Sequence, residues 1–258
     1  MNWAVFSWRS IAGLAVVSVL ALSQGAIAGP VAGSLWYNGD YDGRDAVLNQ
    51  TGFQDGRVYD NFIVPNGFTY TITGAYSNDF MRGVAPATMA WEIRTGVSAG
   101  NGGTLVASGD GAASRVATGR TDVFGGVFIY REFTVQVGVP SVVLGPGSYW
   151  LTAIPDVGDD STNAHGSLIS TTSGASAVGS PAGNDDNSFF SSTFFGANFA
   201  AMTDIEGDGT WDFSMGVIGT SAQIVPEPSS MALLFGPAFL IAGAYYRRRR
   251  QAMVVTAV

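Results

Sequence analysis

The stretch FTYTITGAY, residues 68–76, decides the fold class. Phe68, Tyr70 and Ile72 alternate with threonines. Successive side chains of a β-strand point to opposite faces, so this alternation predicts a strand with one apolar and one polar face. Aromatic and β-branched residues are also favoured in strands. No long stretch between residues 29 and 224 shows a convincing helical period.

The same alternation recurs along the chain in residues 89–97, 125–137, 145–155 and 211–220. Turn-forming glycine pairs separate these runs at Asn38-Gly39, Asp42-Gly43, Asn66-Gly67, Asn101-Gly102-Gly103 and Asp208-Gly209. Many short strands joined by such turns predict an all-β fold, an antiparallel β-sandwich that is jelly-roll-like. We expect one such domain over residues 29–224.

Residues 156–187 differ from the rest of this domain. They are rich in Ser, Gly, Ala, Asn and Asp, with few large apolar side chains. We expect them to form long loops around a short strand near Leu168 and Ile169, because they cannot bury enough apolar surface to build a core layer. The aromatic stretch at residues 188–199 is expected to be a strand that returns to the core.

Charge and composition exclude several classes of partner and site. The net charge is −8, and residues 29–225 hold seven arginines against nineteen acidic residues, a net charge of −12. Such a body is repelled by nucleic acid, so no nucleic-acid partner is expected, whereas divalent cations are attracted. The chain has no cysteine, which excludes disulfides and thiolate sites.

The first 28 residues have the features of a signal peptide. Arg9 precedes an apolar stretch at residues 11–22, and Ala26 and Ala28 form the small-x-small pattern that signal peptidase accepts. We expect cleavage after Ala28, and therefore export.

The C-terminal part has the features of a membrane anchor. Residues 231–246 are uncharged and mostly apolar. As a helix they span about 24 Å, short but workable for one transmembrane helix. The cluster that follows, Arg247, Arg248, Arg249 and Arg250, favours the cytoplasmic side. Residues 251–258 are then a short cytoplasmic tail.

A Pro-Glu-Pro strip lies just before this span, in the segment Val225, Pro226, Glu227, Pro228, Ser229. Proline holds the chain extended, and an extended strip beside a membrane is a segment that a membrane protease can bind. Strip, span and arginine cluster together (residues 225–250) resemble the PEP-CTERM sorting signal of Gram-negative bacteria. The resemblance implies recognition by an exosortase, and an inner-membrane-anchored precursor that is passed to the cell surface or extracellular matrix. One departure is the eight residues that follow the arginines.

The body also resembles a recurrent ectodomain of PEP-CTERM exported proteins. The stretches that carry this resemblance are LWYNGDYDGRD, RVYDNFIVP, WEIRTGVSAGNGGTLVASG, PGSYWLTA and NSFFSSTFFGANF followed by FSMGVIG. The resemblance implies a secreted β domain, and it carries no assigned activity.

Two acidic clusters are candidate calcium sites. In DIEGDGTWD, residues 204–212, acids stand at positions 1, 3, 5 and 9 of a calcium loop, namely Asp204, Glu206, Asp208 and Asp212. The bidentate acid of position 12 is missing, and an Asp-Gly hairpin turn is the alternative interpretation. Asp40, Asp42 and Asp45 form the second cluster, for which solvated loop acids, one neutralised by Arg44, are the alternative.

Catalytic patterns are weak. His165 is the only histidine and no G-x-S-x-G elbow occurs, which argues against a Ser-His-Asp triad and a histidine zinc site. Glu92 and Glu132 lie within predicted strands and are the candidate carboxylates for glycoside hydrolysis. An exposed ion pair of Glu92 with Arg94 is a simpler interpretation of Glu92.

Aromatic residues beside acidic loops suit sugar stacking, with Trp36, Tyr37 and Tyr41 as candidates and core packing as the alternative for Trp36.

Taken together, these features lead us to expect a non-enzymatic exported module of biofilm or exopolysaccharide, with no cofactor other than a candidate calcium ion. The alternatives are a secreted carbohydrate-active enzyme and a calcium-dependent adhesion module.

Overall fold

The computed structural model describes residues 29–225 except 53, 84, 125–127, 159–165, 184 and 208. The predicted signal peptide, the transmembrane span, the arginine cluster and the tail lie outside the described residues, as do His165 and Asp208. Among the described residues, no helix is long and apolar enough to cross a membrane.

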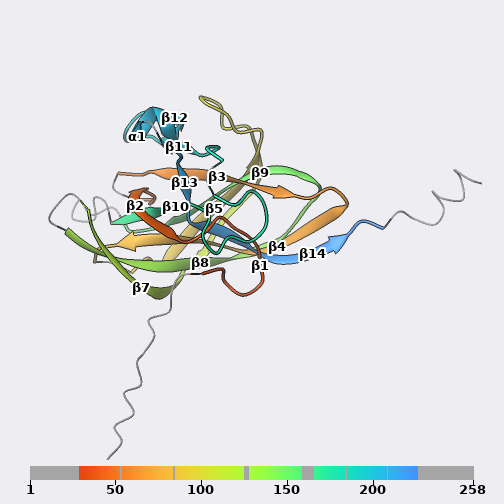
Figure 1. Ribbon diagram of the computed structural model, residues 1–258, viewed down its shortest axis with the longest axis horizontal. Helices are drawn as coiled ribbons and strands as arrows, with labels where there is room; N and C mark the ends of the chain where they lie inside the picture. The colour runs from red at the N-terminus through yellow and green to blue at the C-terminus, as the bar shows by residue number, and fades with distance from the viewer. Residues whose placement is uncertain are drawn as a thin grey trace, which may run out of the picture.

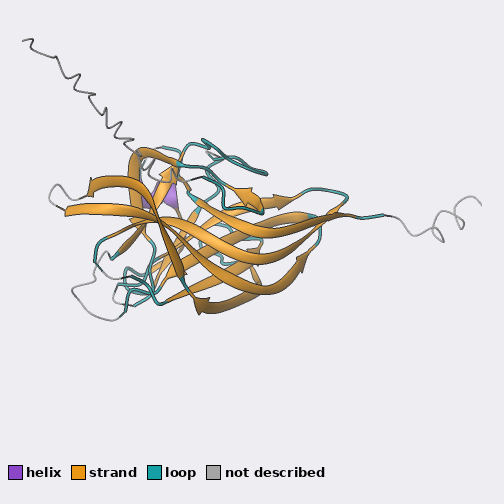
Figure 2. Ribbon diagram, turned by 90° about the horizontal axis from the view of Figure 1, so that it is seen from below, coloured by secondary structure: helices purple, strands orange, loops and turns teal. Residues whose placement is uncertain are grey.

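The body consists of two antiparallel sheets (Figures 1 and 2). The path of the first sheet runs β1 (Ser34–Tyr37), β14 (Met215–Gln223), β4 (Phe68–Met81), β10 (Ser167–Thr172) and β13 (Asp212–Phe213). It also holds β2 (Tyr41–Leu48) beside β10, β8 (Phe128–Leu144) beside β4, and β7 (Ser114–Phe124) beside β8. The second sheet has the order β12 (Ala197–Ala201), β11 (Phe189–Ser192), β3 (Arg57–Val64), β9 (Gly147–Pro155), β5 (Thr88–Thr95) and β6 (Thr104–Ala112). This confirms the all-β class.

Alternating side chains build the core between the sheets, as the period-two pattern predicts. In β3, Val58, Phe62 and Val64 belong to the main buried cluster, and Ile72 of β4 and Val217 of β14 belong to the same cluster. All five stretches predicted as strands from their alternation contain strands in the structure, and β10 confirms the short strand expected near Leu168 and Ile169. Strand β14 pairs with β4 along its whole length, and Val217 lies opposite Ala75.

The expectation for residues 156–187 is wrong in one respect. Strand β10 is fully buried and pairs with β2, β4 and β13, so it belongs to the core of the first sheet. Its small hydroxyl residues are buried through hydrogen bonds: Ser170 donates to Glu132 (2.9 Å) and Ser167 to Asp79 (3.2 Å). Burying a polar group costs little free energy when the group is hydrogen-bonded. The distribution of apolar residues in the sequence does not reveal such hydrogen bonds, so it did not predict that this strand is buried.

Two further expectations need correction. Residues 188–199 form a hairpin, β11 and β12, with a turn at residues 193–196 in which Gly196 has a positive φ of 67°. As a result Phe190 enters the core, whereas Phe194 and Phe195 are exposed. The Asp42-Gly43 pair is not a turn, because it lies within β2.

Candidate metal centre

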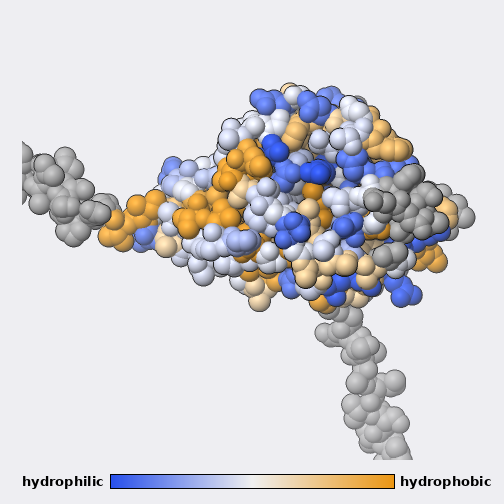
Figure 3. All heavy atoms as spheres, turned by 180° about the vertical axis from the view of Figure 1, so that it is seen from behind, coloured by the Kyte–Doolittle hydropathy of each residue, from blue (hydrophilic) through white to orange (hydrophobic). Residues whose placement is uncertain are grey.

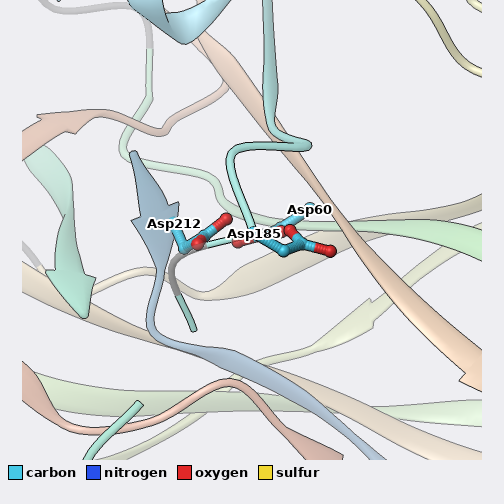
Figure 4. Close-up of side chains that lie close together, drawn as sticks. All are labelled: Asp60, Asp185 and Asp212. Atoms are coloured by element: carbon cyan, nitrogen blue, oxygen red, sulfur yellow. The ribbon is translucent and has the colours of Figure 1, made fainter. Parts of the chain in front are cut away.

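Three carboxylates from distant parts of the chain meet at one place (Figure 4). Asp60 lies in β3 of the second sheet, Asp212 in β13 of the first sheet, and Asp185 on the loop between β10 and β11. One carboxylate oxygen from each lies within 4.8 Å of the others. Asp60 and Asp212 are buried, and Asp185 is exposed. The cluster therefore joins both sheets and the loop.

Asp60 is held rigidly by donors. Its Oδ2 accepts hydrogen bonds from the Asn38 side-chain amide (2.8 Å) and the Phe213 backbone N–H (2.7 Å). Its Oδ1 accepts one from the Asn61 backbone N–H (2.8 Å). Burial, followed by the nearby Asp212 carboxylate, nevertheless raises the pKa of Asp60 well above 3.8. The strand thus holds the Asp60 carboxylate in one position, and the groups that bind it there are neutral donors rather than cations.

Asp212 is the least satisfied member of the cluster. It is fully buried, and neither carboxylate oxygen completes a hydrogen bond with a described residue. Burial and then the carboxylate of Asp185 raise the pKa of Asp212 from 3.8 to about 7, although the nearby backbone N–H groups of Asp185 and Asp186 counter part of this rise. A buried carboxylate without hydrogen-bond partners raises the free energy of the folded state, so binding of a proton or a cation would stabilise Asp212.

The donor set fits a hard divalent cation. It contains only oxygen, and Ca²⁺ takes six to eight oxygen ligands, with carboxylates prominent among them. The amide of Asn61 reaches the site, since its Nδ2 donates to Asp185 Oδ2 (3.0 Å), and its buried Oδ1 has no partner among the described residues. Asp60, Asp185 and Asp212 would hold the ion, with Asn61 beside them. The loop origin of Asp185 suits the adaptable geometry of calcium better than the strict octahedron of magnesium.

The predicted calcium loop is only partly present in this arrangement. Of its four acids, Asp212 belongs to the carboxylate cluster, and Asp208 lies outside the described residues. Asp204 and Glu206 sit instead on a short helix, α1 (Met202–Glu206), and the cluster does not include them. Glu206 lines an apolar cavity of about 630 Å³ together with Ile205, Phe190 and Phe195, and although the residue is exposed, partial burial of its carboxyl group raises its pKa.

The second predicted cluster, Asp40, Asp42 and Asp45, does not converge into a cation site among the described residues. Asp42 pairs with Arg44 at 2.6 Å, as the alternative interpretation expected, but these acids are not solvated, because Asp40 is buried and Asp42 and Asp45 are half-buried. Asp40 accepts hydrogen bonds from the Tyr37 hydroxyl (2.8 Å) and the Ser176 hydroxyl (2.7 Å).

The candidate sugar contacts are corrected by burial. Trp36 and Tyr37 have no exposed surface, because Trp36 stacks on Phe62 across the two sheets and Tyr37 lies in a polar network under Asp40. Tyr41 is half-buried, with its ring against Phe80 and its hydroxyl on Asp122. Trp36 and Tyr37 therefore cannot stack on a sugar.

The two strand glutamates are both paired. Glu92 forms ion pairs with Arg94 and with Arg57, each at 2.7 Å, so the predicted pair exists but is mostly buried and is shared with a second arginine. Glu132 is fully buried and accepts from Arg120 (3.0 Å) and Thr118 (2.7 Å). Neither glutamate belongs to the cluster of Asp60, Asp185 and Asp212.

Sequence reasoning missed Asp60 and Asp185. Asp60 has the parity of the core residues Val58 and Phe62 within a mostly buried strand. An acidic residue at such a position is the signal that could have identified it, since a charge on the core face needs a partner. Asp185 stands among other Asn and Asp residues of a loop, and nothing in that context distinguishes it.

Comparison of the chain with models of protein families, with curated proteins and with solved structures gave no match.

Proposed function

We propose that the chain is an exported, non-enzymatic module of the cell surface or extracellular matrix of a Gram-negative bacterium, with a jelly-roll-like sandwich fastened by calcium. The observation that supports the calcium part is Asp212, which is buried beside Asp60 and Asp185 and whose two carboxylate oxygens complete no hydrogen bond with a described residue. Export by signal peptidase and exosortase is supported by the two ends of the sequence, residues 1–28 and 225–250.

A cation at this position would act as a structural cross-link. Asp60 and Asp212 belong to different sheets, and Asp185 belongs to the loop that covers them. A ligand that binds only the native arrangement stabilises it by mass action. The ion therefore favours the closed sandwich in a calcium-containing medium outside the cell, and the module contacts matrix polysaccharide or protein through its outer surface.

Calcium is expected to raise the melting temperature of the full chain by several degrees. A ligand at 100 times its Kd contributes about 2.7 kcal/mol, and for a domain of this size about 1 kcal/mol shifts the melting temperature by about 2–4 °C. Thermal unfolding in calcium, in magnesium and in chelator measures this directly. The proposal fails if calcium and chelator give the same melting curve.

Asp204→Asn provides the matched control for the calcium measurement. Asp204 is exposed on α1 and was the first ligand of the predicted loop. Because the carboxylate cluster excludes it, its replacement is expected to leave the calcium response unchanged. A response lost in this variant would favour the linear loop over the cluster.

Export is tested by replacing Arg247, Arg248, Arg249 and Arg250 with glutamine. Basic residues on the cytoplasmic side hold the orientation of a membrane segment, so the variant is expected to lose most of its surface delivery. Cell fractionation and surface labelling, with Arg115→Gln in the body as the control, measure the change. Unchanged surface delivery would count against the sorting interpretation.

A further inference from the structure

One end of the sandwich is apolar and exposed. Phe68 begins β4, Val143 lies near the end of β8, and Ile224 and Val225 follow β14. Their exposed fractions are 38%, 67%, 45% and 76%. Register brings them together: Gln223 lies opposite Phe68, Thr71 lies opposite Val143, and the Ile224 N–H donates to the Gly67 carbonyl (2.7 Å). We call these four residues the β14 tip.

Hydrophobic atoms are visible at the end of the body where β14 finishes (Figure 3), and Figures 1 and 2 both place the end of β14 beside the turn that joins β3 and β4. The candidate metal centre lies away from this end. Strand β3 ends here at Val64, and Asp60 is four residues earlier in the same strand. The β14 tip is therefore separate from the candidate metal centre.

The segments that form this end carry no charge. Residues 61–78, 133–155 and 213–225 contain no Asp, Glu, Lys or Arg, although residues 29–225 have a net charge of −12. All charged residues of the body lie outside these three segments. The opposite end also exposes apolar side chains, but there Ile129 and Phe128 stand beside Arg131 and Arg82. The β14 tip is the neutral end of an acidic body.

The chain itself limits how far the β14 tip can lie from the predicted membrane span. Val225 is the last residue of the tip, and the apolar run begins at Met231, six residues later. A fully extended chain advances at most about 3.6 Å per residue, which limits the separation to about 20 Å. An acidic surface at this distance would be repelled by anionic lipid, whereas a neutral apolar surface gains from entering the headgroup boundary.

We propose that the β14 tip rests on the headgroup–acyl boundary of a phospholipid bilayer while the precursor is anchored. This rests on the membrane anchoring of the proposed function and adds the contact surface and its lipid partner. The contact holds the sandwich upright on the membrane with its acidic parts away from the lipid. It also keeps the Pro226-Glu227-Pro228 strip at the membrane surface, where a membrane protease reaches it.

The absence of cysteine allows a direct test, because each introduced cysteine is unique. Val143→Cys and Ile129→Cys form a matched pair: the two residues are 67% and 68% exposed and lie fourteen residues apart on β8, about 45 Å along the strand. The full chain is reconstituted in vesicles of phosphatidylethanolamine and phosphatidylglycerol, and each cysteine carries a fluorophore. Quenching by nitroxide-labelled lipid is then measured, and Phe68→Cys serves as a second tip position.

Several-fold stronger quenching at positions 143 and 68 than at 129 is the expected result. Equal quenching at positions 143 and 129 in chains that float with the vesicles would overturn the tip contact and leave the anchor intact. A chain that does not float with the vesicles would overturn the anchor and, with it, the tip contact. Chemical unfolding of each variant confirms that the exposed substitutions leave the fold unchanged.

Discussion

Trp36→Ala is expected to destabilise the protein by about 3–5 kcal/mol, the range for removing a large buried aromatic side chain. The Trp36 ring has no exposed surface and stacks on Phe62 with a centroid separation of 5.5 Å, so it ties β1 of one sheet to β3 of the other. Its indole N–H donates to the Pro181 carbonyl (2.9 Å), which fastens the loop that also carries Asp185. Urea unfolding followed by circular dichroism measures the loss.

Two matched variants separate packing from surface effects in this measurement. Trp36→Phe keeps an aromatic ring but loses the N–H, and is expected to cost less than Trp36→Ala. Phe194→Ala removes an aromatic ring that is 53% exposed, and its effect is expected to stay within about 0.5 kcal/mol. If Trp36→Ala unfolded at the same urea concentration as the parent chain, the placement of Trp36 in the core would be wrong.

The strands that the sequence predicted well are those with large alternating side chains, such as β4 and β9. Burial of aromatic and branched residues dominates the energetics there, and it leaves a period of two in the sequence. Strand β10 left no such pattern because its serines and threonines are buried through side-chain hydrogen bonds to Asp79 and Glu132. Those partners lie on β4 and β8, far away in sequence.

The candidate metal centre shows the same limit. Asp212 was named as a ligand from its local acidic context, but its neighbours in the cluster are Asp60 and Asp185 rather than Asp204 and Glu206. Convergence of Asp60 and Asp212 depends on how the two sheets pack, since they are separated by some 150 residues. A linear motif detects only ligands that one loop supplies. An acidic residue that alternates in step with the core residues of a strand is a more general signal of a buried ligand.

Asp212→Asn is expected to stabilise the chain in chelator and to remove most of its calcium response. Without the ion, the variant removes a buried carboxylate that completes no hydrogen bond within the described part of the chain, while asparagine keeps its size. Because the pKa of Asp212 is raised from 3.8 to about 7, ionising it in the native state costs up to about 4 kcal/mol. The variant should therefore be more stable than the parent chain at pH 7.5 in chelator.

The pH dependence of this effect follows from the direction of the shift. A carboxyl group whose native pKa is raised binds its proton more tightly in the native state than in the unfolded chain. Without calcium, the parent chain should lose stability as the pH rises from about 4 to about 7, and the variant should lose less. Some dependence should persist in the variant, because burial also raises the pKa of Asp79 to about 7 and the pKa of Asp60 well above 3.8.

With calcium at about 100 times its Kd, the parent chain should gain about 2.7 kcal/mol and the variant almost nothing, because the ion requires the charged carboxylate. The free energy of unfolding of both chains, measured from pH 4 to pH 8 in calcium and in chelator, tests the two effects together. A variant less stable than its parent in chelator would show that hydrogen bonds already satisfy Asp212. A variant that kept the full calcium response would place the ion elsewhere. A gain in chelator requires that Asp212 is buried without adequate partners, and a lost calcium response requires that it is directed at the ion, so the combined result separates a metal ligand from an ordinary core residue.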